Sequence, residues 1–121
     1  PREIAPSRSV DADPVVSPDR TRIAFTRSAA NGGLDLWVMD ADGENAVNLG
    51  SDSMRESSPA WSPDGSRIFY VGSLRGRLPR LYVFDRRNDT RSPVTDSLHP
   101  VQDYAVSPDG KSLVFATVKD D

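Results

Sequence analysis

The tripeptide Ser-Pro-Asp occurs three times in this chain, and its spacing constrains the fold more than any other feature. The copies begin at Ser17, Ser62 and Ser107, so the two intervals are equal (62 − 17 = 45 and 107 − 62 = 45). A fixed period of about 40–45 residues is typical of one four-stranded blade of a β-propeller. The sequence therefore predicts an all-β protein made of antiparallel four-stranded blades.

The residues around each copy predict a strand, a tight turn and a second strand. In Pro-Asp-Gly, proline presets φ, aspartate can bond the backbone beyond it, and glycine accepts a positive φ. Gly65 and Gly110 end the second and third copies, whereas the first copy has Arg20 at that place. We therefore expect the first turn to be slightly strained or differently shaped. The runs that follow, such as Arg67–Val71, are rich in β-branched and aromatic residues, which favours buried strands.

Each unit should contain four strands, named a to d from the inside of the propeller outward. The expected ranges are about 13–17, 58–62 and 103–107 for a, about 21–27, 66–72 and 111–118 for b, Asp35–Asp40 and Arg80–Asp85 for c, and Ala46–Leu49 and Ser92–Thr95 for d. A further outer strand is expected at Arg2–Ala5, two periods before Val94.

These strands predict a single propeller segment over residues 1–121. It consists of a first blade at about 12–50, a second at about 57–96 and a partial blade at about 103–118. The segment is thus an incomplete ring of about two and a half blades. Repeat units bury their apolar faces against neighbours, so we expect self-association, or the remaining blades of a larger parent chain, to close the ring.

Charge and composition exclude several classes of function. The chain has 15 basic and 18 acidic residues, a net charge of −3, and no basic stripe that would indicate a nucleic-acid partner. It has no cysteine, which excludes disulfides and thiol catalysis. No apolar window has the length of a membrane-spanning helix, so membrane insertion is not expected, and no signal peptide begins this chain.

Two segments resemble a known family. Trp61-Ser62-Pro63-Asp64-Gly65 with the following Arg67-Ile68, and Leu36–Gly43, resemble the WD40-like (PD40) repeat of TolB-type propellers, over about residues 12–118. The resemblance implies a non-catalytic scaffold for protein–protein interaction, periplasmic or otherwise extracytoplasmic, in the bacterial cell envelope. Similar repeats occur in prolyl-oligopeptidase-like serine peptidases. The alternative is therefore a regulatory, substrate-gating propeller whose catalytic domain lies outside this chain.

The chain itself shows no catalytic constellation. His99 is the only histidine, and no G-x-S-x-G elbow is present, so we expect no enzyme activity, no catalytic residue and no cofactor. Asp40, Asp42 and Asn45 form a weak calcium candidate, because oxygen ligands alternate around a glycine as in a calcium loop. The same residues also suit an ordinary hairpin turn, which we favour.

The remaining candidate is a binding surface for a protein or peptide. The resemblance implies that the loops joining strand d to the next strand a, and strand b to strand c, share one face around the central channel. Exposed arginine, histidine and apolar residues on loops are candidate recognition groups, although for any single residue an ordinary variable loop is the favoured interpretation. The candidates are Asn31, Met54, Arg55, Glu56, Arg75, Arg77, Leu98 and His99.

Overall fold

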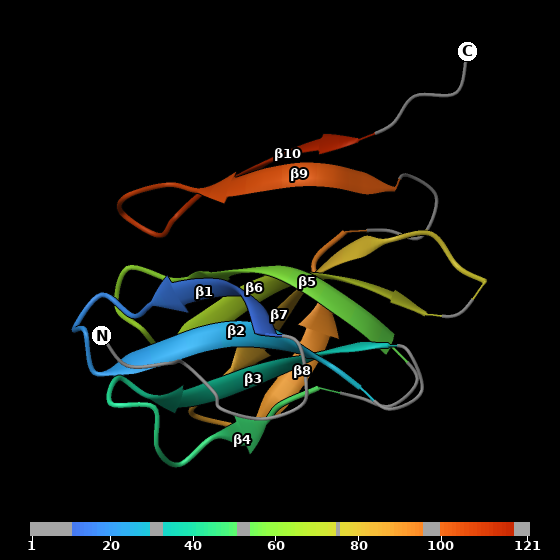
Figure 1. Ribbon diagram of the computed structural model, residues 1–121. Helices are drawn as coiled ribbons and strands as arrows, with labels where there is room; N and C mark the ends of the chain where they lie inside the picture. Colours follow the sequence, from blue (N-terminus) through green and yellow to red (C-terminus); the bar gives the residue numbers. More distant parts are fainter. Residues whose placement is uncertain (1–10, 30–32, 51–53, 75, 96–99, 118–121) are drawn as a thin grey trace.

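The computed structural model describes residues 11–29, 33–50, 54–74, 76–95 and 100–117, and every regular element in these ranges is a strand. The strands form two four-stranded antiparallel sheets and one two-stranded sheet (Figure 1). None of the described segments is a helix that could cross a membrane. The predicted all-β blade architecture is confirmed.

The strand order within each sheet follows the chain, as in a propeller blade. Blade 1 contains β1 (Asp11–Val16), β2 (Arg22–Ser28), β3 (Leu34–Asp40) and β4 (Val47–Asn48). Blade 2 contains β5 (Met54–Trp61), β6 (Arg67–Leu74), β7 (Arg80–Asp85) and β8 (Thr90–Pro93), and blade 3 is represented by β9 (Val101–Val106) and β10 (Leu113–Thr117).

The inner strands differ from the sequence-based expectation. β5 begins at Met54, whereas we expected the strand to begin at about residue 58. A bulge between Ser57 and Ala60 accommodates the longer strand, with Ser58 at a φ of 56° before Pro59. A bulge lets two residues oppose one, so the strand can bend and continue past a proline. The expected strand at Arg2–Ala5 lies outside the described residues.

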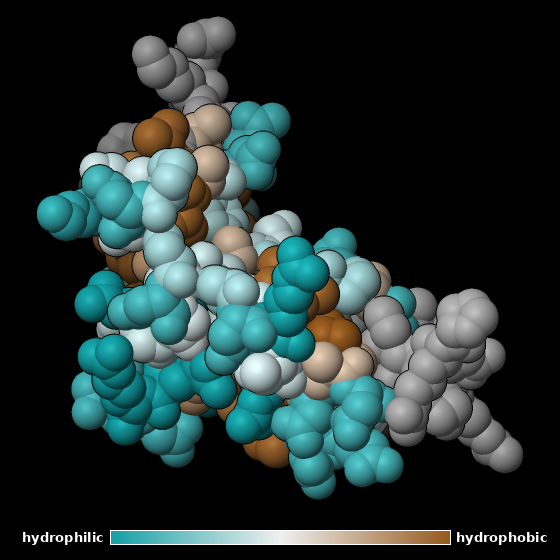
Figure 2. Space-filling view, turned by 90° about the vertical axis from the view of Figure 1, so that its left-hand side faces the viewer, coloured by the Kyte–Doolittle hydropathy of each residue, from teal (hydrophilic) through white to brown (hydrophobic). Residues whose placement is uncertain are grey.

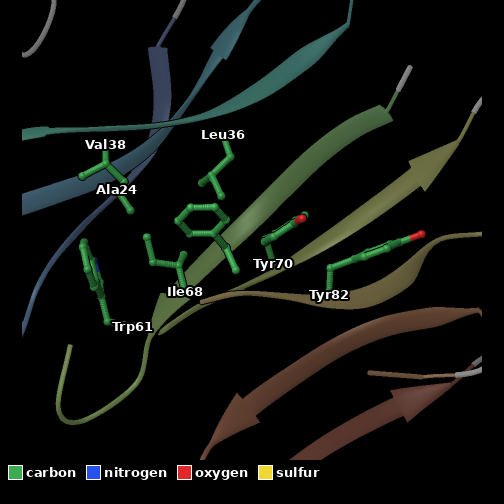
Figure 3. Packing of buried hydrophobic residues seen from close by; sticks show 8 residues of the cluster. Ala24, Leu36, Val38, Trp61, Ile68, Tyr70 and Tyr82 are labelled. Atoms are coloured by element: carbon green, nitrogen blue, oxygen red, sulfur yellow. The ribbon is translucent and has the colours of Figure 1, made fainter. Parts of the chain in front are cut away.

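Blades 1 and 2 enclose one apolar core between their facing sheets. Ala24, Leu36 and Val38 of blade 1 pack against the second sheet (Figure 3). The residues that blade 2 contributes to this cluster are Trp61, Ile68, Tyr70, Tyr82 and Phe84. Removing apolar area from water is the main stabilising contribution to such an interface.

Large apolar side chains on the predicted strands are mostly buried. Phe25, Trp61, Ile68, Tyr70 and Leu81 all have a relative exposure of 8% or less. Ile23 and Val83 are partly buried. The side chain of Phe115 is outside the described part of the structure.

Polar contacts join each blade to the next. The indole Nε1 of Trp61 in blade 2 donates to the carbonyl oxygen of Val15 in blade 1, at 2.9 Å. The Tyr104 hydroxyl of blade 3 has two carbonyl acceptors within hydrogen-bond distance, that of Ser58 at 2.5 Å and that of Phe69 at 2.9 Å. Buried aromatic groups with polar atoms usually find such a partner. These bonds fix how far each blade can slide on its neighbour.

Candidate partner-binding site

The recurring Ser-Pro-Asp motif is a closed hydrogen-bonded turn. Ser17 Oγ donates to Asp19 Oδ1 at 2.7 Å, and the same carboxylate oxygen accepts the Thr21 amide at 3.0 Å. Ser17 Oγ in turn accepts the Arg22 amide at 3.1 Å. The second and third copies repeat the serine-to-aspartate bond at 2.8 and 2.6 Å. The hydroxyl and carboxylate of each motif are thus engaged in shaping the turn.

These bonds also keep the aspartates ionised. The amide of Thr21 and the hydroxyls of Ser17 and Thr21 lower the pKa of Asp19 to about 2. The equivalent donors, first of them the Ser66 amide, lower the pKa of Asp64 further below its usual range. A carboxylate with so low a pKa is a poor general base at neutral pH. The motif therefore has a structural role.

The turns lie together at one end of the blades, on the left in Figure 1, and Figure 2 views the molecule from that side. Hydrophilic residues cover most of this side (Figure 2). Apolar surface appears at the height of β9 and β10, where Val114 is 70% exposed. Apolar residues are also exposed at this end outside blade 3, among them Val16 at 53% at the end of β1, so the surface is mainly but not wholly polar.

The opposite end of blade 2 brings the described site candidates together. β5 begins there, β6 ends there, and residues 76–79 connect β6 to β7. Met54 is paired with Leu74, and Arg55 with Ser73. The connection carries Arg77. The start of β5 and the β6–β7 connection therefore lie at one end of the blade, and Met54 and Arg55 belong to β5 itself rather than to the loop on which they were expected.

A pocket of about 230 Å³ opens at this end of blade 2. Two leucines on its wall are exposed to solvent, Leu74 at 39% and Leu78 at 51%. Gly76 has a φ of 75°, which shapes a turn closed by a bond from the Arg77 amide to the Leu74 carbonyl at 2.8 Å. Among the described residues, its lining consists of Leu74, Gly76, Arg77, Leu78, Arg80 and Tyr82.

The inner wall of the pocket is held in place by several contacts. Arg80 donates from Nε and Nη2 to the Thr95 carbonyl oxygen, at 3.1 and 2.7 Å, and its guanidinium lies 5.9 Å from the Tyr82 ring centre. Tyr82 stacks on Tyr70 with ring centres 5.7 Å apart. A wall held in this way is pre-organised for a ligand, which lowers the entropic cost of binding.

Arg77 differs from Arg80, because its side chain makes no hydrogen bond or ion pair with another described residue. It is exposed at the rim beside Leu78. A guanidinium presents five N–H donors in a planar fork suited to a carboxylate. The pocket therefore combines an apolar wall with a cation that can pair with a ligand.

Glu56 was expected on a binding loop, and that placement is wrong. It lies in β5, its side chain is fully buried, and its Oε1 accepts the Leu36 amide of blade 1 at 2.9 Å. A carboxylate directed toward a neighbouring blade is not accessible to a partner. Its role in this structure is to join blades 1 and 2.

The other predicted site residues have different outcomes. Met54 is partly buried against the core between blades 1 and 2, and Arg55 is exposed. Their part in partner binding stays a prediction, as does that of Arg77. Four candidates lie outside the described residues: Asn31, Arg75, Leu98 and His99.

The calcium candidate forms a hairpin turn. Asp40 is ion-paired with Arg22 at 3.0 Å and accepts from Asn45 Nδ2 at 2.7 Å, while Asp42 accepts the Glu44 amide at 2.9 Å. Throughout the described ranges, no group of three or more His, Cys, Asp or Glu could hold a metal ion. The turn interpretation accounts for these side chains.

Five of the described pocket residues were not among the sequence-based candidates: Leu74, Gly76, Leu78, Arg80 and Tyr82. The two leucines carried a usable signal, because large apolar residues in a connection between strands have no core to fill. Arg80 and Tyr82 carried none, since both belong to a regular strand whose position next to a pocket depends on tertiary packing.

A family model described as the TolB beta propeller domain matches residues 17–121. The chain is 28% identical over 107 residues to an uncharacterized peptidase, YuxL, of Bacillus subtilis, which covers 84% of this chain and 16% of that protein. It is 41% identical over 78 residues to the Tol-Pal system protein TolB of Hahella chejuensis, which covers 62% of this chain and 18% of that protein. The chain thus spans less than a fifth of either relative.

Two solved structures are similar in fold. A putative TolB from Agrobacterium tumefaciens matches with a TM-score of 0.75 and 23% identity, over 88% of this chain and 39% of that one. An oligogalacturonate lyase in complex with manganese matches with a TM-score of 0.72 and 22% identity, over 91% of this chain and 31% of that one. Since a shared fold hosts unrelated functions, these matches support the blade architecture alone.

Proposed function

Because the chain belongs to the family of TolB β-propeller domains, we propose that it is a non-catalytic propeller segment that binds a protein or peptide in the bacterial envelope. The match to a Tol-Pal system protein supports this role and a periplasmic or other extracytoplasmic location. The serine and aspartate of the repeated motif are engaged in turns, which argues against a catalytic role for them.

One observation carries the proposal: one end of blade 2 exposes apolar and cationic side chains together. Leu74, Leu78 and Arg77 surround a pocket there, whereas the other end of the same blade is closed by a polar turn. Recognition surfaces characteristically combine apolar anchors with arginine.

The proposal includes closure of the ring by further blades or by further copies of the chain. Val114 of β10 occupies the register of Phe69 in blade 2 (114 − 69 = 45). Phe69 is 5% exposed because blade 3 covers it, whereas Val114 is 70% exposed. The same face is therefore covered in blade 2 and open in blade 3, which supports a further unit against β10.

A crosslinking experiment in the full-length protein tests the proposal. A photo-crosslinking amino acid replaces Leu78 at the pocket end or, as the matched control, Lys111 at the turn end, in the bacterium that makes the protein. We expect discrete protein adducts from position 78 and few from position 111. Adducts from neither position, or equally from both, would contradict binding at this end.

A second candidate is supported by the match to the B. subtilis peptidase, which covers more of this chain than the TolB match does. In this alternative the segment is the regulatory propeller of a serine peptidase whose catalytic domain is encoded elsewhere in the parent. Hydrolysis of a chromogenic dipeptide by the full-length protein, blocked by a serine-directed organophosphate, would favour it over the scaffold.

A further inference from the structure

We propose that the pocket lined by Leu74, Leu78, Arg77 and Tyr82 recognises a partner segment in which one large apolar side chain is flanked by carboxylates. The inference rests on the proposed function, since it specifies what the pocket end of the propeller binds. It adds the chemical class of the bound segment and the residues that select it.

The size of the pocket favours a single side chain. Its volume of about 230 Å³ is below the roughly 300–1,000 Å³ of pockets that enclose drug-sized molecules. Leu74 and Leu78 supply apolar surface that is now exposed to water, and covering it with a leucine or phenylalanine side chain is favourable. The stacked ring of Tyr82 forms part of the wall.

The charge of the pocket favours carboxylates beside that apolar group. Arg77 and Arg80 both line it, and no acidic residue is among its described lining residues. Arg80 already bonds the Thr95 carbonyl, so it mainly adds positive charge. Arg77 has no side-chain partner among the described residues and can form a charge-assisted bond, and such bonds are roughly twice as strong as neutral ones.

The repeat shows that this chemistry is specific to blade 2. Moving back by 45 residues places Ala29, Gly33 and Asp35 at the positions of Leu74, Leu78 and Arg80. Blade 1 therefore lacks both leucines and has an acidic residue in place of the arginine. β2–β3 and β6–β7 pair in the same register over the strands, so Asp35 and Arg80 occupy equivalent positions, paired with Arg27 and Gly72.

A protein segment fits these features better than a nucleic acid. Two exposed leucines offer nothing to a phosphate backbone, and the chain has a net charge of −3. Stacking of a nucleic-acid base would need an exposed aromatic face. Tyr82 is only 7% exposed, because its ring lies next to Tyr70 and Arg80.

Fluorescence anisotropy with short labelled peptides tests the proposal on the full-length protein. The probe contains Asp-Leu-Glu between glycines, and its matched controls contain Asn-Leu-Gln and Asp-Ser-Glu. For one buried side chain and one ion pair we expect a Kd on the order of 1 mM for Asp-Leu-Glu. Each control peptide should bind at least about fivefold more weakly, because it lacks one of the two recognised groups.

Variants locate the binding. Arg77→Glu should weaken Asp-Leu-Glu binding by about tenfold or more, and Leu78→Ser by several fold; both residues are exposed, so folding should be retained. Lys111→Glu makes the same charge change at the turn end and should leave binding unchanged. Retained binding in Arg77→Glu, equal binding of Asn-Leu-Gln, or displacement of the probe by inorganic phosphate or a single-stranded RNA would overturn the proposal.

The crosslinking experiment separates this inference from the broader function. If position 78 still forms protein adducts in the Arg77→Glu protein, the propeller binds a partner, but by other chemistry than that proposed. If adducts disappear with Arg77→Glu and remain with Lys111→Glu, both are supported. Absence of adducts in every variant would contradict the scaffold itself.

Discussion

The amides of Leu36 in blade 1 and Leu81 in blade 2 occupy equivalent positions but have different hydrogen-bond acceptors. Replacing two residues near Leu36 by their counterparts from the next repeat should replace one kind of acceptor by the other. The Leu36 amide of β3 donates to Glu56 Oε1 at 2.9 Å, across the junction of blades 1 and 2. The equivalent Leu81 amide of β7 donates at 3.0 Å to Thr95 Oγ1 within its own blade. Moving back by 45 residues places Gly50 at the position of Thr95. Gly50 leaves the space that the Glu56 carboxylate occupies, because a Cβ at residue 50 would overlap Oε1.

The second half of the exchange lies on the inner strands. Val101 of β9 stands in the register of Glu56 and is 3% exposed. The junction of blades 1 and 2 thus combines Gly50 with Glu56, and the junction of blades 2 and 3 combines Thr95 with Val101. We therefore consider the variants Gly50→Thr, Glu56→Val and the double variant.

The two single changes should each be destabilising. Glu56→Val leaves the buried Leu36 amide without its acceptor, which costs about 1–3 kcal/mol. Gly50→Thr adds atoms in the space of the carboxylate, and such overpacking costs about 1–3 kcal/mol. In the double variant the threonine hydroxyl can bond the Leu36 amide and valine vacates the space. We expect the double variant to lose about 1–3 kcal/mol less free energy of unfolding than the sum of the losses in the two single variants. Coupling energies of this size are typical of residues in contact.

Urea unfolding of the four proteins measures the coupling, and amide hydrogen exchange locates it. Leu36 should lose protection in Glu56→Val and regain it in the double variant, whereas Leu81 serves as the internal control because its acceptor is Thr95 throughout. Single-variant effects that simply add, within about 0.5 kcal/mol, would refute the reasoning. So would a Leu36 amide that exchanges equally fast in the double variant and in Glu56→Val.

Three further perturbations test the turns and the second junction. Arg20 has a φ of 64°, a conformation that costs a non-glycine residue about 1–2 kcal/mol. Arg20→Gly should therefore raise the free energy of unfolding by about 0.5–1 kcal/mol, once the larger entropy of glycine in the unfolded chain is subtracted. A lower urea midpoint would contradict this. Tyr104→Phe removes the hydroxyl that bonds blade 2 and should lower the free energy of unfolding by about 0.5–1.5 kcal/mol in the same assay, and an unchanged midpoint would show that the bond contributes nothing. The pKa of Asp19 is lowered from 3.8 to about 2, so its stabilising contribution is present above about pH 4 and is lost as the pH falls toward 2. Ser17→Ala removes one donor and should raise the pKa of Asp19 in an NMR titration of the carboxyl carbon; an unmoved pKa would show that the Thr21 donors suffice.

The blade architecture could be predicted because its signals are local. Proline, aspartate and glycine at residues 63–65 restrict the backbone whatever surrounds them, and the apolar run at Arg67–Val71 follows at once. Arg80–Asp85 was predicted with its observed bounds, since a turn limits it at each end. Repetition then made these weak signals mutually consistent. The expected strain at Arg20 is likewise confirmed by its positive φ.

The start of β5 and the burial of Glu56 could not be predicted in the same way. A bulge depends on how two strands pair, so the sequence placed the start of the strand at about residue 58 and left residues 54–57 in the preceding loop. A glutamate is seldom fully buried, and no local pattern distinguishes a surface carboxylate from one that bonds an amide of another blade. The comparison of Gly50 with Thr95 across the repeat does indicate the burial of Glu56. Thr95 supplies the acceptor for the Leu81 amide, whereas Gly50 has no side chain to do so, and Glu56 accepts the Leu36 amide instead.

The same comparison between blades bears on where function should be sought. In a chain whose backbone repeats at a strict interval, residues that serve the fold recur, as the serine and aspartate of the three turns do. Leu74 and Leu78 do not recur: blade 1 has Ala29 and Gly33 at those positions. They do not stabilise a core either, since both are more than a third exposed. These two leucines are therefore the reason for the proposal that a partner covers this end of blade 2, and the adjacent Arg77 is the reason for proposing that the bound segment is acidic.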